Sequence, residues 1–309
     1  MNVTLAFVTY NRLHYTRLAL ASILADKTEQ FSLYIWDNAS SDDTPEFLKS
    51  ISDPRIKDVV LSKRNVGQIE AVNSIWSRSK DELLGKCDND CIMTPGWTKP
   101  LAQAHVDIRN LGVVACWHYF PDDFDLRRAE HKIQTFGSHK ILRHPWTCGT
   151  GLLIKRSAYE RFGHLTGPGT TGYWLKMAMA GYINGFYYPL IHQEHMDDPK
   201  SSHSVLKDEQ SYQAAKAVTF NINRHGQETL LDRWVWRQRV LDELLDSPWQ
   251  AKFYVGWRKK ARMSVSRLRR KFFNDEALLR KQAKIAMLDA QSRLKSDTPV
   301  KSELVMEST

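Results

Sequence analysis

Apolar residues recur along the first half of the chain with two different periods. Short runs rich in β-branched and aromatic residues predict buried strands at residues 3–10, 31–36 and 56–61. The stretches between them, including residues 13–24 and 68–78, carry apolar residues at helical spacing. Strands that alternate with helices favour an α/β, Rossmann-like fold, in which helices flank a mostly parallel sheet.

The three predicted strands, and the stretch at residues 81–87, each end in a cluster of polar residues. These clusters occupy residues 9–12, 37–43, 64–67 and 88–90. Ligands of parallel sheets bind beyond the carboxyl ends of the strands. We therefore expect the four loops to converge on one crevice.

The second half of the chain is less regular. Apolar runs predict strands at residues 111–117 and 185–191, and helical spacing predicts a helix over residues 174–180. Residues 120–140 are charged and predict a loop. From about residue 205 onwards the pattern is helical and more polar.

Two carboxylates, Asp88 and Asp90, follow an apolar strand with one residue between them. Such a pair often only forms a turn or a cap, whereas at the ligand edge of a sheet it can hold Mg²⁺ or Mn²⁺ beside substrate phosphates. His195 follows a later strand and offers an imidazole as a further ligand. Spacing alone does not choose between His195, His192 and His203.

Asp37 and the stretch at residues 65–67 each allow two interpretations. Asp37 ends the second predicted strand, where it either caps the following helix or accepts a hydrogen bond from the ring N–H of a nucleobase. Asn65 and Gly67 favour positive φ angles, so they form a plain turn or bring backbone close to a nucleoside.

Composition indicates an ordinary globular protein with a reduced interior. Hydrophobic residues make up 42% of the 309 residues, and no run of apolar residues is long enough to predict a membrane span. Residues 1–10 read as a first strand and not as a signal peptide. Four cysteines without paired spacing indicate buried thiols in a cytoplasmic protein.

The excess positive charge lies in one segment. The net charge is +9, and residues 252–271 hold nine Lys or Arg and no acid, which leaves 35 basic and 35 acidic residues elsewhere. Apolar residues recur there every three or four positions, at Phe253, Trp257, Ala261, Val265, Leu268 and Phe272. This pattern predicts a basic amphipathic helix over residues 248–273, which suits an anionic membrane surface. The alternative is a helix packed on the rest of the protein; no motif supports a nucleic-acid partner.

Four short motifs follow one another along the chain: Thr9-Tyr10-Asn11-Arg12, Asp37-Asn38-Ala39-Ser40, Arg64-Asn65-Val66-Gly67 and Asp88-Asn89-Asp90. Their order and spacing resemble the family 2 glycosyltransferases with the GT-A fold, of the type that builds bacterial polysaccharide or lipopolysaccharide. The glycine turn at residues 148–151 and the segment that closes at His195 resemble the same family. The resemblance covers roughly residues 1–200.

This resemblance implies a nucleotide-diphospho-sugar donor and Mn²⁺ or Mg²⁺ as cofactor. It implies metal ligation by Asp88, Asp90 and His195. The donor site would be lined by Thr9, Tyr10, Asn11, Arg12, Asp37, Asn65, Gly67, Asp88 and Asn89. A base ring N–H that faces Asp37 favours UDP- or dTDP-sugars.

The chain departs from the family where the general base is expected. Residues 169–174 contain no acid. An inverting transfer needs a carboxylate to take the acceptor's proton, and the nearest substitutes in sequence are Glu194, Asp197 and Asp198. A retaining mechanism or an inactive domain would explain the gap as well. Trp146, Tyr173 and Trp174 predict a stacking platform for an acceptor sugar, with ordinary partly buried aromatics as the alternative.

We expect a GT-A domain over residues 1–205, a helical extension over 206–295 and a disordered tail over 296–309. The expected function is metal-dependent sugar transfer to a glycan or lipid-linked glycan by a peripheral enzyme on the inner face of the cytoplasmic membrane. One alternative is a catalytically inactive sugar-nucleotide-binding or scaffold protein. Another is a nucleotidyltransferase, which usually needs a glycine-rich phosphate loop, whereas residues 9–14 contain no glycine.

Overall fold

The computed structural model describes residues 2–25, 27, 30–167, 169–216, 227–273 and 275–296. The chain divides into two compact units, Met1–His195 with Leu241–Ser264 and Met196–Val240 with Val265–Thr309. The tail expected from residue 296 onwards lies outside the described residues, apart from residue 296 itself. No helix within the described ranges has both the length and the apolar character needed to cross a membrane.

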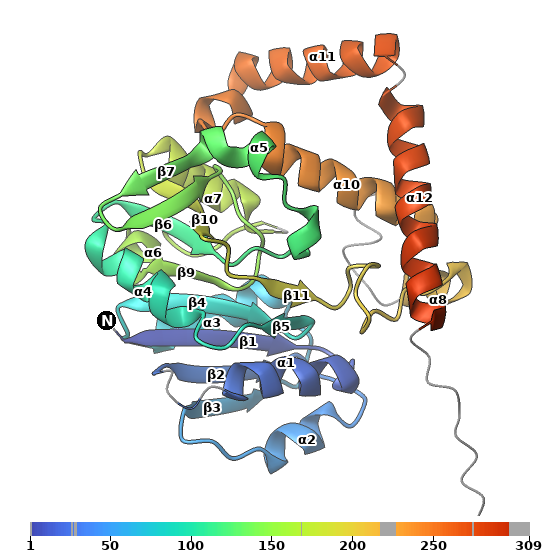
Figure 1. The fold of residues 1–309 in the computed structure, drawn as a ribbon. Helices are drawn as coiled ribbons and strands as arrows, with labels where there is room; N and C mark the ends of the chain where they lie inside the picture. Colours follow the sequence, from blue (N-terminus) through green and yellow to red (C-terminus); the bar gives the residue numbers. More distant parts are fainter. Residues whose placement is uncertain are drawn as a thin grey trace, which may run out of the picture. The chain divides into compact units, whose positions relative to one another are not determined.

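A nine-stranded sheet forms the centre of the first unit, in the order β3-β2-β1-β4-β9-β6-β10-β8-β7 (Figure 1). Its strands are β1 (Val3–Thr9), β2 (Ser32–Asp37), β3 (Ile56–Leu61), β4 (Leu83–Asp88), β6 (Leu111–Ala115), β7 (Ile133–Phe136), β8 (His139–Arg143), β9 (Leu152–Lys155) and β10 (Ile183–Tyr188). Strands β3, β2, β1 and β4 are parallel, as are β6 and β10, whereas β9 is antiparallel to both β4 and β6. The predicted α/β fold with a mostly parallel sheet is confirmed.

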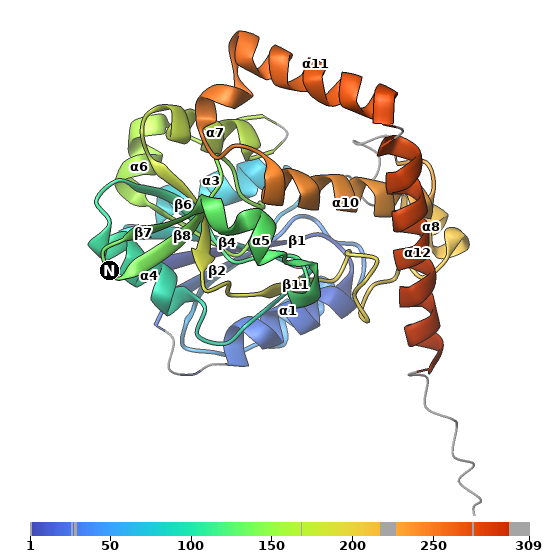
Figure 2. The same ribbon diagram turned by 45° about the horizontal axis from the view of Figure 1, so that its top comes forward.

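Helices cover both faces of this sheet. Figures 1 and 2 show α1 and α4 on one side and α3, α6 and α7 on the other. Within Met1–His195 the α-helices are α1 (Leu13–Ala25), α2 (Thr44–Ser50), α3 (Gln68–Arg78), α4 (Thr98–Asp107), α5 (Leu126–Ala129), α6 (Arg156–Phe162) and α7 (Thr171–Met179). Because it is covered on both faces, β1 is buried along its whole length, as its continuous apolar run requires.

The register of the parallel strands aligns their carboxyl ends. Thr9 at the end of β1 lies opposite Asp37 at the end of β2, and Val8 lies opposite Asp88 at the end of β4. The polar loops that follow these three strands therefore start side by side. This alignment is the physical basis of the predicted crevice.

A two-stranded antiparallel ribbon, β5 (Cys91–Met93) with β11 (Gln193–His195), lies next to the carboxyl end of β4. Its register pairs Cys91 with His195. The ribbon joins segments about one hundred residues apart in the sequence. Strands of three residues are too short to show a hydrophobic period, so the sequence did not predict it.

The predicted loop over residues 120–140 is wrong in part, because it contains β7 and the start of β8. These strands form a hairpin at one edge of the sheet, closed by Gly137 at φ 60°. Most charged residues of this segment lie before the hairpin, at residues 122–132, and β7 itself carries none. The charged stretch is what made the whole segment resemble a loop.

The predicted helix over residues 248–273 starts later than expected. A 3₁₀ turn, Ala251–Tyr254, precedes α11 (Gly256–Phe273), and Gly256 has a φ of 55°. The hydroxyl of Ser247 does not cap this helix but lies 2.7 Å from the hydroxyl of buried Tyr254. Burial of Tyr254 thus fixes a bend between α10 (Leu230–Asp246) and α11.

The second unit contains α8 (Glu209–Lys216), α12 (Asp275–Ser296) and parts of α10 and α11. A buried cluster holds it together, formed by Leu206, Tyr212, Leu230, Trp234, Val235 and Ala283. The hydroxyl of Tyr212 donates to the carbonyl of Gln227 at 2.8 Å. Because Ala283 lies on α12, that helix is part of a core and not a solvated appendage.

We expect the first unit to lose stability below neutral pH because it buries neutral histidines. His105 on α4 is fully buried beside the carbonyl of Leu153, 3.1 Å away, and burial lowers its pKa to about 3. Between pH 6.5 and pH 3 the unfolded chain binds a proton there that the folded chain does not, so stability falls as the pH falls. His105→Gln keeps an N–H donor but cannot bind this proton. It should reduce the dependence of the free energy of unfolding on pH by roughly 1.4 kcal/mol per pH unit.

Urea unfolding at pH 7, 6 and 5 measures this slope. His144 is also buried, and burial holds its pKa well below the ordinary value, so it provides a second contribution that remains in the variant. Equal slopes for wild type and His105→Gln would contradict the assignment.

Candidate functional site

The loops after β1, β2 and β4 are tied into one network of hydrogen bonds. Asn89 donates to the hydroxyls of Thr9 at 3.2 Å and Thr16 at 3.3 Å. The backbone N–H of Ser41 donates to the side chain of Asn11 at 2.8 Å. The predicted convergence of these loops at one edge of the sheet is therefore present in the structure.

Two consecutive residues after β1 have left-handed backbone. Asn11 has a φ of 53° and Arg12 a φ of 64°, a conformation that costs free energy for residues other than glycine. The N–H of Asn11 donates to the hydroxyl of Ser40 at 2.7 Å, which holds the turn. The turn places a guanidinium nitrogen of Arg12 3.6 Å from a carboxylate oxygen of Asp90.

Asp37 lies buried at the end of β2, and its carboxylate accepts from the N–H of Ser40 at 3.0 Å and from the Ser40 hydroxyl. The next residue, Asn38, accepts from the N–H of Val66 at 2.8 Å. This bond ties the loop after β3 to the end of β2. The residues predicted to contact a nucleoside thus occupy neighbouring loops.

Asp88 is held by two residues that sequence reasoning missed, Lys86 and Gln68. Its Oδ1 accepts from the Lys86 ammonium and from Gln68 Nε2 at 2.7 Å. Lys86 also donates to the carbonyl of Gly149 at 2.5 Å. Burial raises the pKa of Asp88, and the charge of Lys86 opposes that rise. The available signal was the spacing, since residues two apart on a strand project to the same face.

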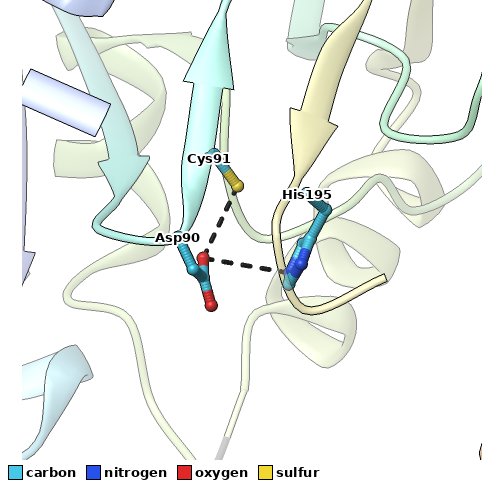
Figure 3. Close-up of side chains that lie close together, drawn as sticks. All are labelled: Asp90, Cys91 and His195. Carbon is cyan, nitrogen blue, oxygen red and sulfur yellow. Dashed lines mark hydrogen bonds and ion pairs between the residues drawn. The ribbon is translucent and has the colours of Figure 1, made fainter. Parts of the chain in front are cut away.

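Asp90 and His195 form the other half of the site together with Cys91 (Figure 3). Asp90 Oδ1 lies 3.9 Å from His195 Nε2 and accepts from Cys91 Sγ at 3.6 Å. Burial raises the pKa of Asp90, but His195 and Arg12 lower it by more, which favours the ionised carboxylate. Burial and the charge of Asp90 raise the pKa of the Cys91 thiol well above its ordinary value.

The donor set of Asp90 and His195 fits a divalent cation. Bonds of about 2.0–2.2 Å place two ligand atoms roughly 3–4 Å apart, and 3.9 Å lies within that span. Asp88 was predicted to share this ion, but its Oδ1 is taken by Lys86 and Gln68. Nδ1 of His192, one of the two alternative histidines, lies 3.2 Å from the carbonyl oxygen of Tyr119 instead.

The glycine turn after residue 148 packs against Gln193. The side chain of Gln193 donates to the carbonyls of Cys116 at 3.3 Å and Thr150 at 3.1 Å. Gly151 has a φ of 58°, and a Cβ there would lie 2.3 Å from Gln193 Oε1. The Thr150 hydroxyl in turn accepts from the N–H of Asp88 at 2.9 Å. The turn therefore supports the end of β4.

Gly151→Ala should destabilise the protein more than Gly137→Ala does. Both glycines have left-handed φ, 58° and 60°, which costs an alanine about 1–2 kcal/mol. Gly137 has open space around it, so only Gly151→Ala must also displace Gln193. Thermal unfolding of the two variants measures the difference. Equal losses would show that the contact with Gln193 is unimportant.

The structure separates the three candidates for the general base. Glu194 neighbours His195 on β11, so the two side chains project to opposite faces of the ribbon. Asp198 accepts from Arg237 Nε at 2.7 and 2.6 Å in a buried ion pair. That pair gives Asp198 a structural role, and its role as a base stays a prediction. The carbonyl of Asp197 accepts from Arg233 at 3.3 Å.

The predicted stacking platform of three aromatics does not form. Trp174 is fully buried, and Tyr173 is buried with its hydroxyl donating to the carbonyl of Gly163 at 2.7 Å. Neither ring offers a face to a sugar, because both fill the core under α7. Trp146 is partly exposed and packs edge-on against His144, with 4.4 Å between the ring centroids.

Comparisons with known proteins identify the family and the fold of this chain. The profile of Glycosyl transferase family 2 matches residues 4–165. The mannosyltransferase PcManGT from Pyrobaculum calidifontis, solved with GDP-Man and Mn²⁺, superposes with a TM-score of 0.53 at 17% identity, over 96% of this chain and 87% of that chain. GalNAc-T7, solved with UDP, GalNAc and Mn²⁺, gives a TM-score of 0.47 at 14% identity, over 63% of this chain and 43% of that chain. A search of curated proteins found no significant match.

The expected GT-A fold is confirmed by the likeness to the first of these structures, and the C-terminal helices follow it. The family profile covers more than half of the 309 residues. The chain therefore belongs to glycosyl transferase family 2 and is a glycosyltransferase.

Proposed function

We propose that this glycosyltransferase transfers a sugar from a nucleotide-diphospho-sugar, with a divalent cation at Asp90 and His195, to a glycan or lipid-linked glycan. One observation carries the proposal. The side chains of Asp90 and His195, about one hundred residues apart in sequence, lie 3.9 Å apart beside the ends of the parallel strands. A cation there neutralises charge on a departing diphosphate.

The donor half of the proposed site consists of the loops after β1, β2 and β3. The buried carboxylate of Asp37 suits a ring N–H of uracil or thymine, so UDP- and dTDP-sugars are the first donors to test. Guanine also presents a ring N–H, and GDP-sugars belong in the same screen. Asp88, oriented by Lys86, faces the ribose and sugar side of the donor in this proposal.

Release of nucleoside diphosphate tests the proposal. The protein is incubated with each sugar nucleotide and either Mn²⁺ or a chelator, with and without a lipid-linked glycan acceptor. We expect release from one donor class, dependent on Mn²⁺ and accelerated by acceptor. No release from UDP-, dTDP- or GDP-sugars under any condition would overturn the proposed reaction.

We propose that one of Glu194, Asp197 and Asp198 is the general base of an inverting transfer, because the N-terminus of α7 has no carboxylate. Each of the three is replaced in turn by its amide, and turnover and thermal stability are measured. Asp198→Asn should lower stability as well, because it breaks a buried ion pair with Arg237. Normal turnover in all three variants would remove the assignment.

We further propose that the enzyme works at an anionic membrane surface, the inner face of the cytoplasmic membrane, in the assembly of polysaccharide or lipopolysaccharide. Along α11, Trp257, Val265 and Leu268 are 69%, 66% and 54% exposed. Arg258, Lys259 and Lys260 on the same helix are exposed as well. Exposed apolar side chains beside cationic ones support contact of α11 with a lipid headgroup region, and not packing of α11 against the protein.

Co-sedimentation with vesicles of neutral and anionic phospholipid tests this surface. Deletion of the helical extension is unsuitable, because α12 contributes Ala283 to a buried cluster. The double variant Trp257→Ser/Leu268→Ser should bind about 100-fold less tightly, since each buried side chain contributes about 1.5 kcal/mol or more. Leu278→Ser/Leu288→Ser removes equally exposed side chains from α12 and serves as control. Equal binding by both double variants would exclude α11 as the membrane contact.

A further inference from the structure

We propose that Cys91 is a third protein ligand of the cation site at Asp90 and His195. The site would then prefer a thiophilic divalent cation of the Zn²⁺ type over Mg²⁺. The inference rests on the proposed function only in placing a cation at these side chains. Neither the family profile nor the sequence motifs assign a role to this cysteine.

The backbone brings the thiol to the site through the register of the ribbon. Cys91 on β5 pairs directly with His195 on β11. Residues opposite each other in an antiparallel pair project to the same face of the ribbon. Asp90 precedes Cys91 by one residue, at the turn that ends β4. Figure 3 shows the sulfur and the imidazole directed towards the same carboxylate oxygen.

The distances suit a tetrahedral cation. Cys91 Sγ lies 3.6 Å from Asp90 Oδ1, that oxygen lies 3.9 Å from His195 Nε2, and the three ligand atoms lie within 4.8 Å of one another. Bonds of about 2.3 Å to sulfur and 2.0–2.1 Å to nitrogen and oxygen put tetrahedral ligand atoms roughly 3.3–3.6 Å apart. Changes in these separations of about 1.5 Å or less close the set.

Ligation replaces a hydrogen bond that already exists. The thiol donates to Asp90 Oδ1, so its proton occupies the line between sulfur and oxygen. When the cation enters, the S–H bond breaks, the sulfur electron pair forms the metal–sulfur bond and the proton passes to water. Thiolate favours Zn²⁺, whereas Mg²⁺ prefers oxygen ligands and keeps its waters.

The arrangement distinguishes Cys91 from the other thiols. All four cysteines are free, and Cys87, on the same stretch of chain, is also buried. Within the described residues, the one group of three or more His, Cys, Asp or Glu ligand atoms close enough for a metal is Asp90, Cys91 and His195. Cys148 Sγ instead donates to the carbonyl of Thr150 at 3.2 Å. Cys87 therefore provides a matched control.

Cadmium is the probe for the thiolate ligand, because sulfur bound to Cd²⁺ gives an ultraviolet charge-transfer band. Cd²⁺ is titrated into the full-length chain as wild type, Cys91→Ser and Cys87→Ser. We expect one equivalent of Cd²⁺ to produce the band in wild type and Cys87→Ser but not in Cys91→Ser. Competition with Zn²⁺ should show that Cys91→Ser binds Zn²⁺ more than about 10-fold less tightly.

Two results would overturn the inference: no band in wild type, or an unchanged band in Cys91→Ser. Cadmium NMR of the wild-type protein, where a sulfur ligand shifts the resonance strongly, gives the same answer if Cys91→Ser does not fold. Mn²⁺-dependent UDP binding is measured alongside. If wild type shows the cadmium band but no Mn²⁺-dependent UDP binding, the proposed function alone is contradicted. If wild type binds UDP in the presence of Mn²⁺ but shows no cadmium band, the Cys91 ligand alone is contradicted.

Discussion

Asp90→Asn is expected to lower metal-dependent sugar transfer by about 10³-fold, which corresponds to about 4 kcal/mol of transition-state stabilisation from the cation. Asparagine keeps the size of the side chain but removes the charge that faces both His195 and Arg12. Without this ionised ligand the site would bind the cation more weakly. The negative charge of the departing diphosphate would then be less well stabilised. Initial rates at saturating donor and Mn²⁺ measure the effect.

The matched control is Asp58→Asn. Asp58 lies on β3 and forms an exposed ion pair with Arg78 at 3.3 Å. Exposed pairs of this kind contribute about 1 kcal/mol or less, so this variant should keep its activity. Full activity in Asp90→Asn, with a circular dichroism spectrum like that of wild type, would show that Asp90 holds no essential cation.

Lys86→Met is expected to destabilise the protein by about 3 kcal/mol, the lower end of the range for breaking a buried ion pair. The Lys86 side chain is 1% exposed and pairs with Asp88, which retains 18% exposure and some hydration. Removing the ammonium leaves a carboxylate largely desolvated and frees the Gly149 carbonyl. The donor-side orientation of Asp88 is lost at the same time, so activity should fall with stability.

A double-mutant cycle separates the two effects. Lys86→Met/Asp88→Asn removes both charges, and stability should recover most of the loss, because replacing a whole buried pair costs far less than breaking it. Activity should remain low, since the double variant lacks the Asp88 carboxylate. Chemical denaturation and initial rates provide the two readouts. Additive losses of stability would show that Lys86 and Asp88 do not act as a pair.

The first half of the fold was predictable because each element is long enough to show its own period. Strand β3 (Ile56–Leu61) and helix α3 (Gln68–Arg78) begin and end at the residues that the pattern indicated. The hairpin of β7 and β8 was missed because its strands are short and follow a charged stretch at residues 122–132. The ribbon of β5 and β11 was missed because its pairing is long-range and its strands are short.

The site shows the same division between local and long-range information. The position of Asp37 and Asp88 at strand ends follows from local pattern, and the register places Asp37 opposite Thr9 and Asp88 opposite Val8. The partner of Asp88 does not follow from pattern, because the Lys86 ammonium is fixed by the Gly149 carbonyl, 63 residues further along. Burial of Trp174 and the ion pair of Asp198 with Arg237 likewise depend on tertiary packing.

The central claim is that a cation held by Asp90 and His195 binds the diphosphate of a sugar nucleotide. Isothermal titration of UDP, dTDP and GDP into wild type and Asp90→Asn, with and without Mn²⁺, tests it most directly. Mn²⁺ should tighten the binding of at least one nucleotide more than about 10-fold in wild type, a gain of about 1.4 kcal/mol, and leave Asp90→Asn unaffected. Affinities that Mn²⁺ does not change for any of the three nucleotides would contradict the claim.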